Sequence, residues 1–298
     1  KNSAGYYLWD VYDPQSGTFD LTKLLTGSQG TLGIITRARF RLIKPKAHSR
    51  LLLIFLRDLK LLAEVINRIL SCRPESFESY DNHTLKIAVK VFPQLVKRLG
   101  KSLLTARWEF LPEFWWVVSG GMPKLILLAE FAADTPEAAF NLAKAAEKKL
   151  EGLLLQTKVT PTAEAAEKYW LIRRESFNLL RQHVRGLRTA PFIDDLIVRP
   201  EKLPEFLPLL YQILEDYDLI YTIAGHVGDG NFHIIPLMDL ARPEAKNMIR
   251  ELTNKVYELV LQFGGSLTAE HNDGLIRSPF LKAMFGEQVY RLFEETKR

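Results

Sequence analysis

The chain has 298 residues, of which 47% are hydrophobic and 25% are charged, the ordinary mixture of a globular protein with one or two domains. No window of about 18 residues is apolar throughout, so we expect no membrane span. The formal charge of +5 comes from basic residues spread along the chain, which gives little support to nucleic-acid binding. Cys72 is the only cysteine, so this chain by itself forms no disulfide framework and holds no iron–sulfur cluster.

The predicted elements begin with a glycine-rich loop at 27–33, which leads into a half-exposed strand over 33–43 and a polar linker. After residue 47 strands alternate with helices, and Asp58 and Thr135 are typical helix N-caps. The strands are predicted at 50–56, 124–133, 155–161 and 191–199. The helices are predicted at 58–72, 134–152, 163–183, 200–217 and 242–263.

This order indicates an α+β fold, an antiparallel sheet with helices packed on one side of it. The strand–helix–strand passages at 50–90 and 125–160 are each compatible with a ferredoxin-like unit. The stretch WEFLPEFWWVVSGGM at 108–122 holds three of the five tryptophans, and a packed loop is favoured there over an aromatic binding surface.

The stretch AGHVGDGNFHIIP at 224–236 places two histidines around a glycine-rich turn. A four-residue hairpin loop pairs His226 with Asn231 and Ala224 with His233. Side chains alternate faces along a strand, so His226, Asn231 and His233 should share one face, with the imidazoles about 6–8 Å apart. In a single straight strand, two positions seven apart would instead face opposite ways.

A second polar motif, GGSLTAEHNDG, follows at 264–274, with a short strand expected over 266–269. Glu270 and His271 are adjacent, so on an extended chain they point to different sides, and one is free to bind a metal while the other faces a substrate. Two histidines and one carboxylate are a common ligand set for zinc or a similar divalent metal. The alternative is two ordinary turns whose imidazoles bond to the backbone. The remaining histidines are interpreted as surface or structural residues: His48, His83 and His183.

Three motifs in order, GSQGTLGIIT, GHVGDGNFH and GGSLTAEHNDG, closely resemble the flavin-linked 2-hydroxyacid dehydrogenases, which include the D-lactate and D-2-hydroxyglutarate dehydrogenases and the flavin subunit of glycolate oxidase. This resemblance implies a vanillyl-alcohol-oxidase type of flavoprotein. Residues 1–46 would be the last segment of its FAD-binding domain, and 47–298 its substrate or cap domain.

The resemblance also implies a role for individual residues. Backbone contact with FAD falls on the glycine-rich segment: Gly27, Ser28, Gly30, Thr31, Gly33 and Ile34. The metal ligands would be His226, His233 and Glu270. His271 would be the catalytic base, and Asn231 would line the same site. Arg173, in the WLIR stretch, would hold the substrate carboxylate, for which a planar guanidinium is well suited.

The sequence departs from the family pattern at three places. Gln29 replaces a glutamate in the glycine-rich segment, and Asn272 and Asp273 replace the usual glycine-containing pair after His271. Ile193 stands where the D-2-hydroxyglutarate enzymes have a lysine, so a cation for a second carboxylate is missing there. The sequence therefore argues against that kind of dicarboxylate specificity.

From the resemblance we expect an FAD-dependent oxidoreductase that converts a small 2-hydroxy acid to the 2-oxo acid and passes electrons to an unidentified acceptor. The family's glycine-rich pyrophosphate loop has no counterpart before Gly27, so we expect residues 1–298 alone to bind no FAD. A cytoplasmic protein is expected, with a peripheral position at the inner membrane surface and a homo-oligomeric state both compatible. A metal-dependent hydrolase and a catalytically silent binding domain stay open as alternatives.

Overall fold

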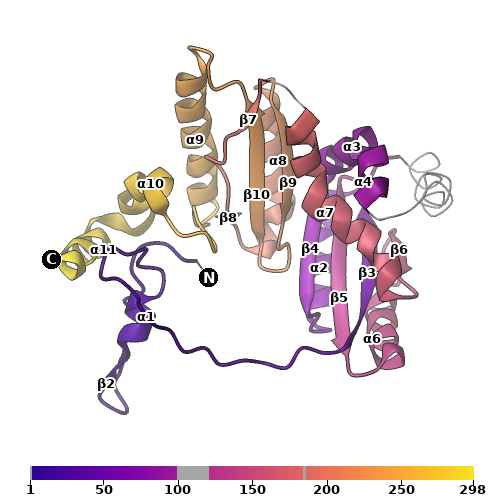
Figure 1. The fold of residues 1–298 in the computed structure, drawn as a ribbon, viewed down its shortest axis with the longest axis horizontal. Coiled ribbons are helices and arrows are strands. Elements are labelled where there is room, and N and C mark those ends of the chain that lie inside the picture. The colour runs from indigo at the N-terminus through magenta and orange to yellow at the C-terminus, as the bar shows by residue number, and fades with distance from the viewer. Residues whose placement is uncertain (1, 99–120, 184–185) are drawn as a thin grey trace.

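The computed structural model describes residues 2–98, 121–183 and 186–298. Figure 1 shows a twisted sheet with helices on both sides, and a smaller group of elements beside it that contains both ends of the chain. All but the last two residues of the tryptophan-rich stretch at 108–122 lie outside the described residues. Among the described residues, no helix combines the length and the apolar composition that crossing a membrane requires.

Four antiparallel strands form a ferredoxin-like half of the sheet in the order β6-β3-β5-β4. They are β3 (His48–Leu56), β4 (Ser76–Asp81), β5 (Leu125–Ala133) and β6 (Gln156–Val159). The crossovers from β3 to β4 and from β5 to β6 contain the 3-10 turn η1 (Leu59–Leu61) with α2 (Leu62–Leu70), and α6 (Pro136–Lys148). The predicted α+β class is confirmed, and the two predicted strand–helix–strand units combine into one layer.

Local signals place the beginnings of two of these helices. The Asp58 carboxylate accepts a hydrogen bond from the Lys60 N–H at 3.0 Å, and the Thr135 hydroxyl accepts one from the Ala138 N–H at 3.2 Å. Both predicted N-caps are therefore confirmed, because each side chain satisfies a backbone donor that the first helical turn leaves free.

The other half of the sheet continues from β4 through β9 and β10. Its strands are β7 (Arg188–Thr189), β8 (Leu196–Ile197), β9 (Ile220–Gly225) and β10 (Asn231–Met238), with β7 and β8 both paired to β10. The strand predicted at 191–199 is reduced to β8, because Asp195 adopts a left-handed backbone conformation with φ +65 that ends regular pairing.

Both faces of the sheet are covered, so the prediction of helices on one side is wrong. Along β3, Leu52 and Ile54 belong to one core, and Leu51 and Leu53 to another on the opposite face. The first core includes residues of α2, α6, α8 (Leu203–Glu215) and α9 (Ala245–Gln262). The second includes residues of α3 (Asn82–Lys90), α4 (Phe92–Arg98) and α7 (Ala163–His183). The reason is the continuous apolar run of β3, which is typical of a strand buried on both faces.

The two ends of the chain meet beside this sheet (Figure 1). The N-terminal elements are β1 (Tyr12–Asp13), β2 (Thr18–Phe19) and α1 (Leu21–Leu25). The C-terminal elements are α10 (Gly274–Arg277), η3 (Ser278–Phe280) and α11 (Leu281–Lys297), and the turn η2 (Pro200–Lys202) precedes α8. The ring of Tyr6 packs edge-on against Phe293, with 6.0 Å between the centroids.

The strand predicted over 33–43 is absent from the structure. Residues 33–46 have no regular secondary structure, and Ile34, Phe40 and Leu42 are 79–89% exposed. The apolar–polar alternation of this segment finds no strand to pair with among the described residues, and a strand is not stable without a partner. The predicted domain boundary near residue 46 falls at the end of this extended connection (Figure 1).

Candidate active site

The β9–β10 hairpin has the predicted register. His233 lies opposite Ala224, and the Asn231 N–H donates to the His226 carbonyl at 3.2 Å. The ring centroids of His226 and His233 are 5.8 Å apart. The predicted turn thus brings the two imidazoles together on one face of the hairpin, as strand periodicity requires.

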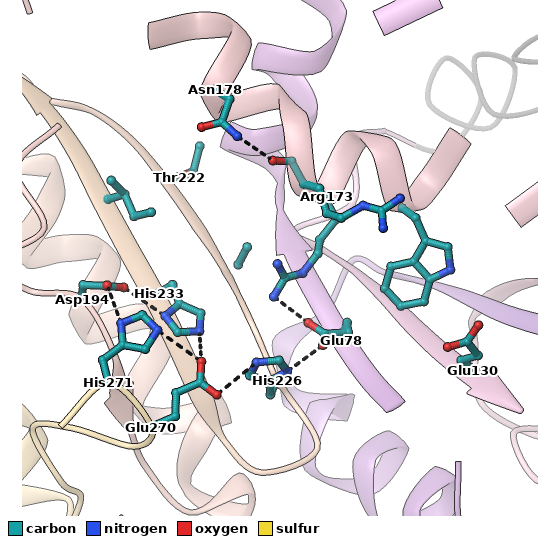
Figure 2. Close-up of a pocket in the computed structure, with 14 residues that line it drawn as sticks. Glu78, Glu130, Arg173, Asn178, Asp194, Thr222, His226, His233, Glu270 and His271 are labelled. Carbon is teal, nitrogen blue, oxygen red and sulfur yellow. Dashed lines mark hydrogen bonds and ion pairs between the residues drawn. The ribbon is translucent and has the colours of Figure 1, made fainter. Parts of the chain in front are cut away.

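Glu270 lies between these two imidazoles, as Figure 2 shows. Its carboxylate oxygens are 3.5 Å from Nε2 of His226 and 3.2 Å from Nε2 of His233. Two imidazole nitrogens and a carboxylate therefore converge on one small volume, although they come from two segments separated by helix α9. The structure brings together the three residues that were predicted as metal ligands.

The far nitrogen of each imidazole faces another carboxylate. Nδ1 of His226 is 2.6 Å from Glu78, and Nδ1 of His233 is 3.0 Å from Asp194. Metal-binding histidines usually donate their second ring N–H to such a partner, which fixes the tautomer and leaves the other nitrogen free to bind. The donor set and its supporting carboxylates therefore fit a divalent transition metal.

The charges of this group support one another. The hydrogen bond that His226 donates to Glu78 raises the pKa of His226 above its ordinary value, although partial burial opposes this. Burial would raise the pKa of Glu78, but its contacts with His226 and Arg173 hold that pKa below its ordinary value. Glu78 is therefore an anion that its neighbours stabilise at neutral pH.

His271 lies on the same side of the chain as Glu270, so the prediction that the two point to different sides is wrong. Its Nε2 is 3.4 Å from the Glu270 carboxylate, and its Nδ1 is 3.3 Å from Asp194. Its ring stacks on His233 at 4.9 Å between centroids. The strand predicted at 266–269 is only a single bridge from Ser266 to Ile197, so the alternation of an extended chain does not apply here.

Hydrogen bonds to Asp195 fix the bent backbone of residues 268–271. Its fully buried carboxylate accepts hydrogen bonds from the backbone N–H groups of Ala269, Glu270 and His271, with donor–acceptor distances of 2.9 to 3.2 Å. The Thr268 hydroxyl adds a contact of 2.6 Å. Burial would raise the pKa of Asp195, but these donors hold it below its ordinary value.

The Asp195 carboxylate also lies with His233, Glu270 and His271 in a group whose potential ligand atoms are within 4.8 Å of one another. We do not count it as a metal ligand. Both of its oxygens already accept hydrogen bonds from backbone N–H groups of Glu270 and His271, and the Asn231 side chain adds a further donor at 3.1 Å. A carboxylate used in this way is an anchor for the backbone.

A cavity of about 740 Å³ opens over this group, and helix α7 forms its opposite wall. It is lined by Glu78, Glu130, Trp170, Arg173, Arg174, Asn178, Asp194, Thr222, Ala224, His226, His233, Ile235, Glu270 and His271. Arg173 thus lies in the same cavity as the three histidines, as its predicted role requires. One nitrogen of its guanidinium, Nη2, forms an ion pair of 2.7 Å with Glu78.

Asn231 is not among the residues that line this cavity. Its side-chain NH₂ donates to the Asp195 carboxylate and to the Leu196 carbonyl, each at 3.1 Å, and the residue is 2% exposed. The described contacts place Asn231 behind the site, in support of Asp195.

The glycine-rich segment reaches the site through the second motif. The Asn272 side chain donates to the Gly27 carbonyl at 2.9 Å, and the Gly274 N–H donates to Gln29 at 3.2 Å. A second cavity of about 350 Å³ is lined by Gly27 and Asn272 together with residues 2–5 and parts of α1. The segment predicted to contact FAD therefore lies beside His271 in space.

The six predicted flavin contacts differ in their exposure. Ser28 is 4% exposed and its carbonyl accepts hydrogen bonds from the N–H and hydroxyl of Thr31 at 2.9 and 2.6 Å. Gly27 and Gly30 have φ of +83 and +77. Gly33 has open space where a side chain would project, and Ile34 is 89% exposed.

Three carboxylates that organise the site were not identified as functional residues from the sequence: Glu78, Asp194 and Asp195. Asp194 and Asp195 stand in the apolar stretch FIDDLIV, which otherwise reads as a buried strand, whereas Glu78 stands in the half-polar stretch SFESYD and is found only from its burial in the structure. A buried acid is rare without a partner, and that is the signal that points to them. Ile193 is fully buried in the main core, so its side chain does not reach the cavity.

The chain thus combines an α+β sheet with a histidine–carboxylate cluster in the wall of a cavity. A family model described as "FAD linked oxidases, C-terminal domain" matches residues 45–298. The chain belongs to this family.

Curated relatives span nearly the whole chain at low identity. The chain is 25% identical over 308 residues to D-2-hydroxyglutarate dehydrogenase of Escherichia coli (strain K12), covering 99% of this chain and 28% of that protein. It is 24% identical over 269 residues to glycolate oxidase subunit GlcD of Bacillus subtilis (strain 168), covering 89% of this chain and 51% of that protein. The chain thus spans between about a quarter and about half of these relatives.

A solved structure of alkyldihydroxyacetonephosphate synthase shares the fold with a TM-score of 0.60, at 15% identity, over 94% of this chain and 49% of that one. This similarity supports the fold alone.

Proposed function

We propose that the protein oxidises a small 2-hydroxy acid to the corresponding 2-oxo acid with FAD as its cofactor. The observation that carries the proposal is the convergence of His226, His233 and Glu270 in one cavity with Arg173, a cation suited to a carboxylate. The relatives are named as enzymes of 2-hydroxy acids, and the chain belongs to an FAD-linked family.

In this proposal one set of residues binds the substrate carboxylate and another set acts on its 2-hydroxyl. Arg173 would orient the carboxylate, and His226, His233 and Glu270 would hold a divalent metal that acts on the 2-hydroxyl. The chemistry that such a metal would supply is a lower pKa of that hydroxyl. His271 would take the hydroxyl proton at Nε2, while Asp194 holds the ring through Nδ1.

The glycine-rich segment, Gly27 to Ile34, is proposed to form one wall of the flavin site. Its contacts with Asn272 and Gly274 support this role, because they hold the segment next to His271. When bound, FAD supplies the acceptor for the hydride from the substrate carbon. The acceptor that reoxidises the flavin is proposed to be a separate electron carrier.

The proposed substrate has one carboxylate. Ile193 is buried in the apolar core and Asp194 contacts two histidines, so this segment contributes no cation to the cavity. The metal-dependent hydrolase is the competing interpretation, and it requires no flavin. An absorbance spectrum and a metal analysis of the full-length protein distinguish the two.

Two neighbouring substitutions test the division of labour. His271→Ala should lower turnover by about 10²–10⁴, the usual contribution of general acid–base catalysis, and leave zinc content nearly unchanged. Glu270→Ala should lose zinc first. His48→Ala, a histidine outside the cavity, is the matched control and should change neither. Equal loss of zinc in the first two variants would show that His271 is a ligand and not the base.

A further inference from the structure

Glu78 lies between the two halves of the proposed site, and neither the family description nor the names of the relatives assign it a role. It is on β4, and β4 pairs with β9 through Ser79 opposite Gly225, one residue before His226. Figure 2 shows its carboxylate between Arg173 and His226. The residue is only 7% exposed, so the carboxylate has little water to replace either partner.

One oxygen of Glu78 serves His226. The distance of 2.6 Å to Nδ1 is that of a strong charge-assisted hydrogen bond. A proton held on Nδ1 leaves the lone pair on Nε2, which faces Glu270 at 3.5 Å. Loss of this carboxylate would free the imidazole to rotate or to change tautomer, which weakens a metal site.

The other oxygen faces Arg173. The Nη2 of Arg173 is 2.7 Å from Oε2, but this oxygen and the Arg173 Nε have no aligned hydrogen-bond partner. The contact is therefore an ion pair that holds the guanidinium close without using all of its donors. The Arg173 guanidinium therefore keeps N–H donors for a substrate, although the Glu78 carboxylate already offsets the positive charge of that guanidinium.

The charged side chains that line the cavity determine how many carboxylates a substrate can bring into it. Among the described residues, four carboxylates line it, Glu78, Glu130, Asp194 and Glu270, against the two cations Arg173 and Arg174. A divalent metal would bring that sum to zero, so one substrate carboxylate adds a single negative charge and a second makes the excess larger. Glu78 is the carboxylate in contact with the arginine that a substrate anion would use.

We propose that Glu78 is a specificity-determining and positioning residue, which holds His226 for the metal and makes the Arg173 site selective for substrates with one carboxylate. This inference rests on the proposed function, since it assumes that Arg173 receives the carboxylate and His226 the metal. The two effects have opposite signs in a Glu78 variant. Metal binding weakens, whereas binding of a dianion improves relative to a monoanion.

The experiment compares Glu78→Gln with a control variant, Glu130→Gln. The control removes a carboxylate from the same cavity, but not one of the ion pairs with Arg173 and His226. Zinc alone is titrated into each full chain by calorimetry, and then D-lactate, with one carboxylate, and D-malate, with two, into the zinc-loaded proteins. Glu78→Gln should weaken zinc binding about tenfold or more. It should raise the affinity for malate relative to lactate about tenfold, the effect of removing one nearby charge. Glu130→Gln should change both ratios less than threefold.

The outcomes separate the proposal from its premise. If the zinc affinity and the ratio of malate affinity to lactate affinity change equally in the two variants, the role of Glu78 is refuted, because the net charge of the cavity alone would account for the result. Loss of zinc affinity together with parallel losses for both acids would indicate a merely structural residue and also refutes it. A wild-type chain that binds no zinc contradicts the proposed metal site as well as the role of Glu78.

Discussion

Asp195 is predicted to be the residue on which the shape of the active-site segment most depends. Its side chain is fully buried and accepts hydrogen bonds from the backbone of Ala269, Glu270 and His271 and from the Thr268 hydroxyl. In Asp195→Asn an NH₂ group replaces one carboxylate oxygen at nearly constant volume. In either orientation of the amide, this donor then faces other donors.

The expected loss follows from these contacts. A hydrogen bond to a charged group contributes about 1.5–3 kcal/mol, and a buried donor left without an acceptor costs about 1–3 kcal/mol. The contacts share one carboxylate and are not additive, so we expect Asp195→Asn to lower the free energy of unfolding by about 3–5 kcal/mol. Urea unfolding at neutral pH measures this. Zinc affinity should fall as well, because Glu270 would lose its position.

Asp218→Asn is the matched control, since Asp218 is exposed and should change stability by less than about 0.5 kcal/mol. If Asp195→Asn loses less than about 1 kcal/mol and binds zinc as the wild type does, other contacts hold the segment and our account of its shape is wrong.

Two further predictions concern the backbone and a buried phenol. Gly230 has φ +78, and a methyl group there would overlap the Val198 carbonyl oxygen. Gly230→Ala should therefore lower the free energy of unfolding by about 3 kcal/mol or more. Gly264→Ala, at φ +67 with open space, should cost only about 1–2 kcal/mol, and equal losses in urea unfolding would refute the steric argument. Tyr257 donates to the Phe192 carbonyl at 2.8 Å, and burial raises its pKa from 10.0 to about 12. The stability advantage of the wild type over Tyr257→Phe, about 1 kcal/mol, should therefore be complete below pH 10 and shrink as the pH rises toward 12, whereas a constant advantage would contradict it.

Local rules were sufficient for the parts of the molecule that depend on neighbouring residues. The register that joins His226 and His233 follows from one short turn and the period of a strand, and the structure has it. Helix α7 has the bounds 163–183 that were predicted, and the caps at Asp58 and Thr135 begin their helices. In each case the interacting groups are close in sequence, so the pattern itself contains the contact.

Contacts between distant segments decided the rest. Glu270 and His271 face the same way because Asp195, about 75 residues earlier, binds the backbone between them. Glu78 reaches His226 only because β4 pairs with β9. The segment over 33–43 has the alternation of a strand but no partner among the described residues, and it stays extended and exposed. Sequence period determines which face a side chain takes, whereas only tertiary pairing determines what that face meets.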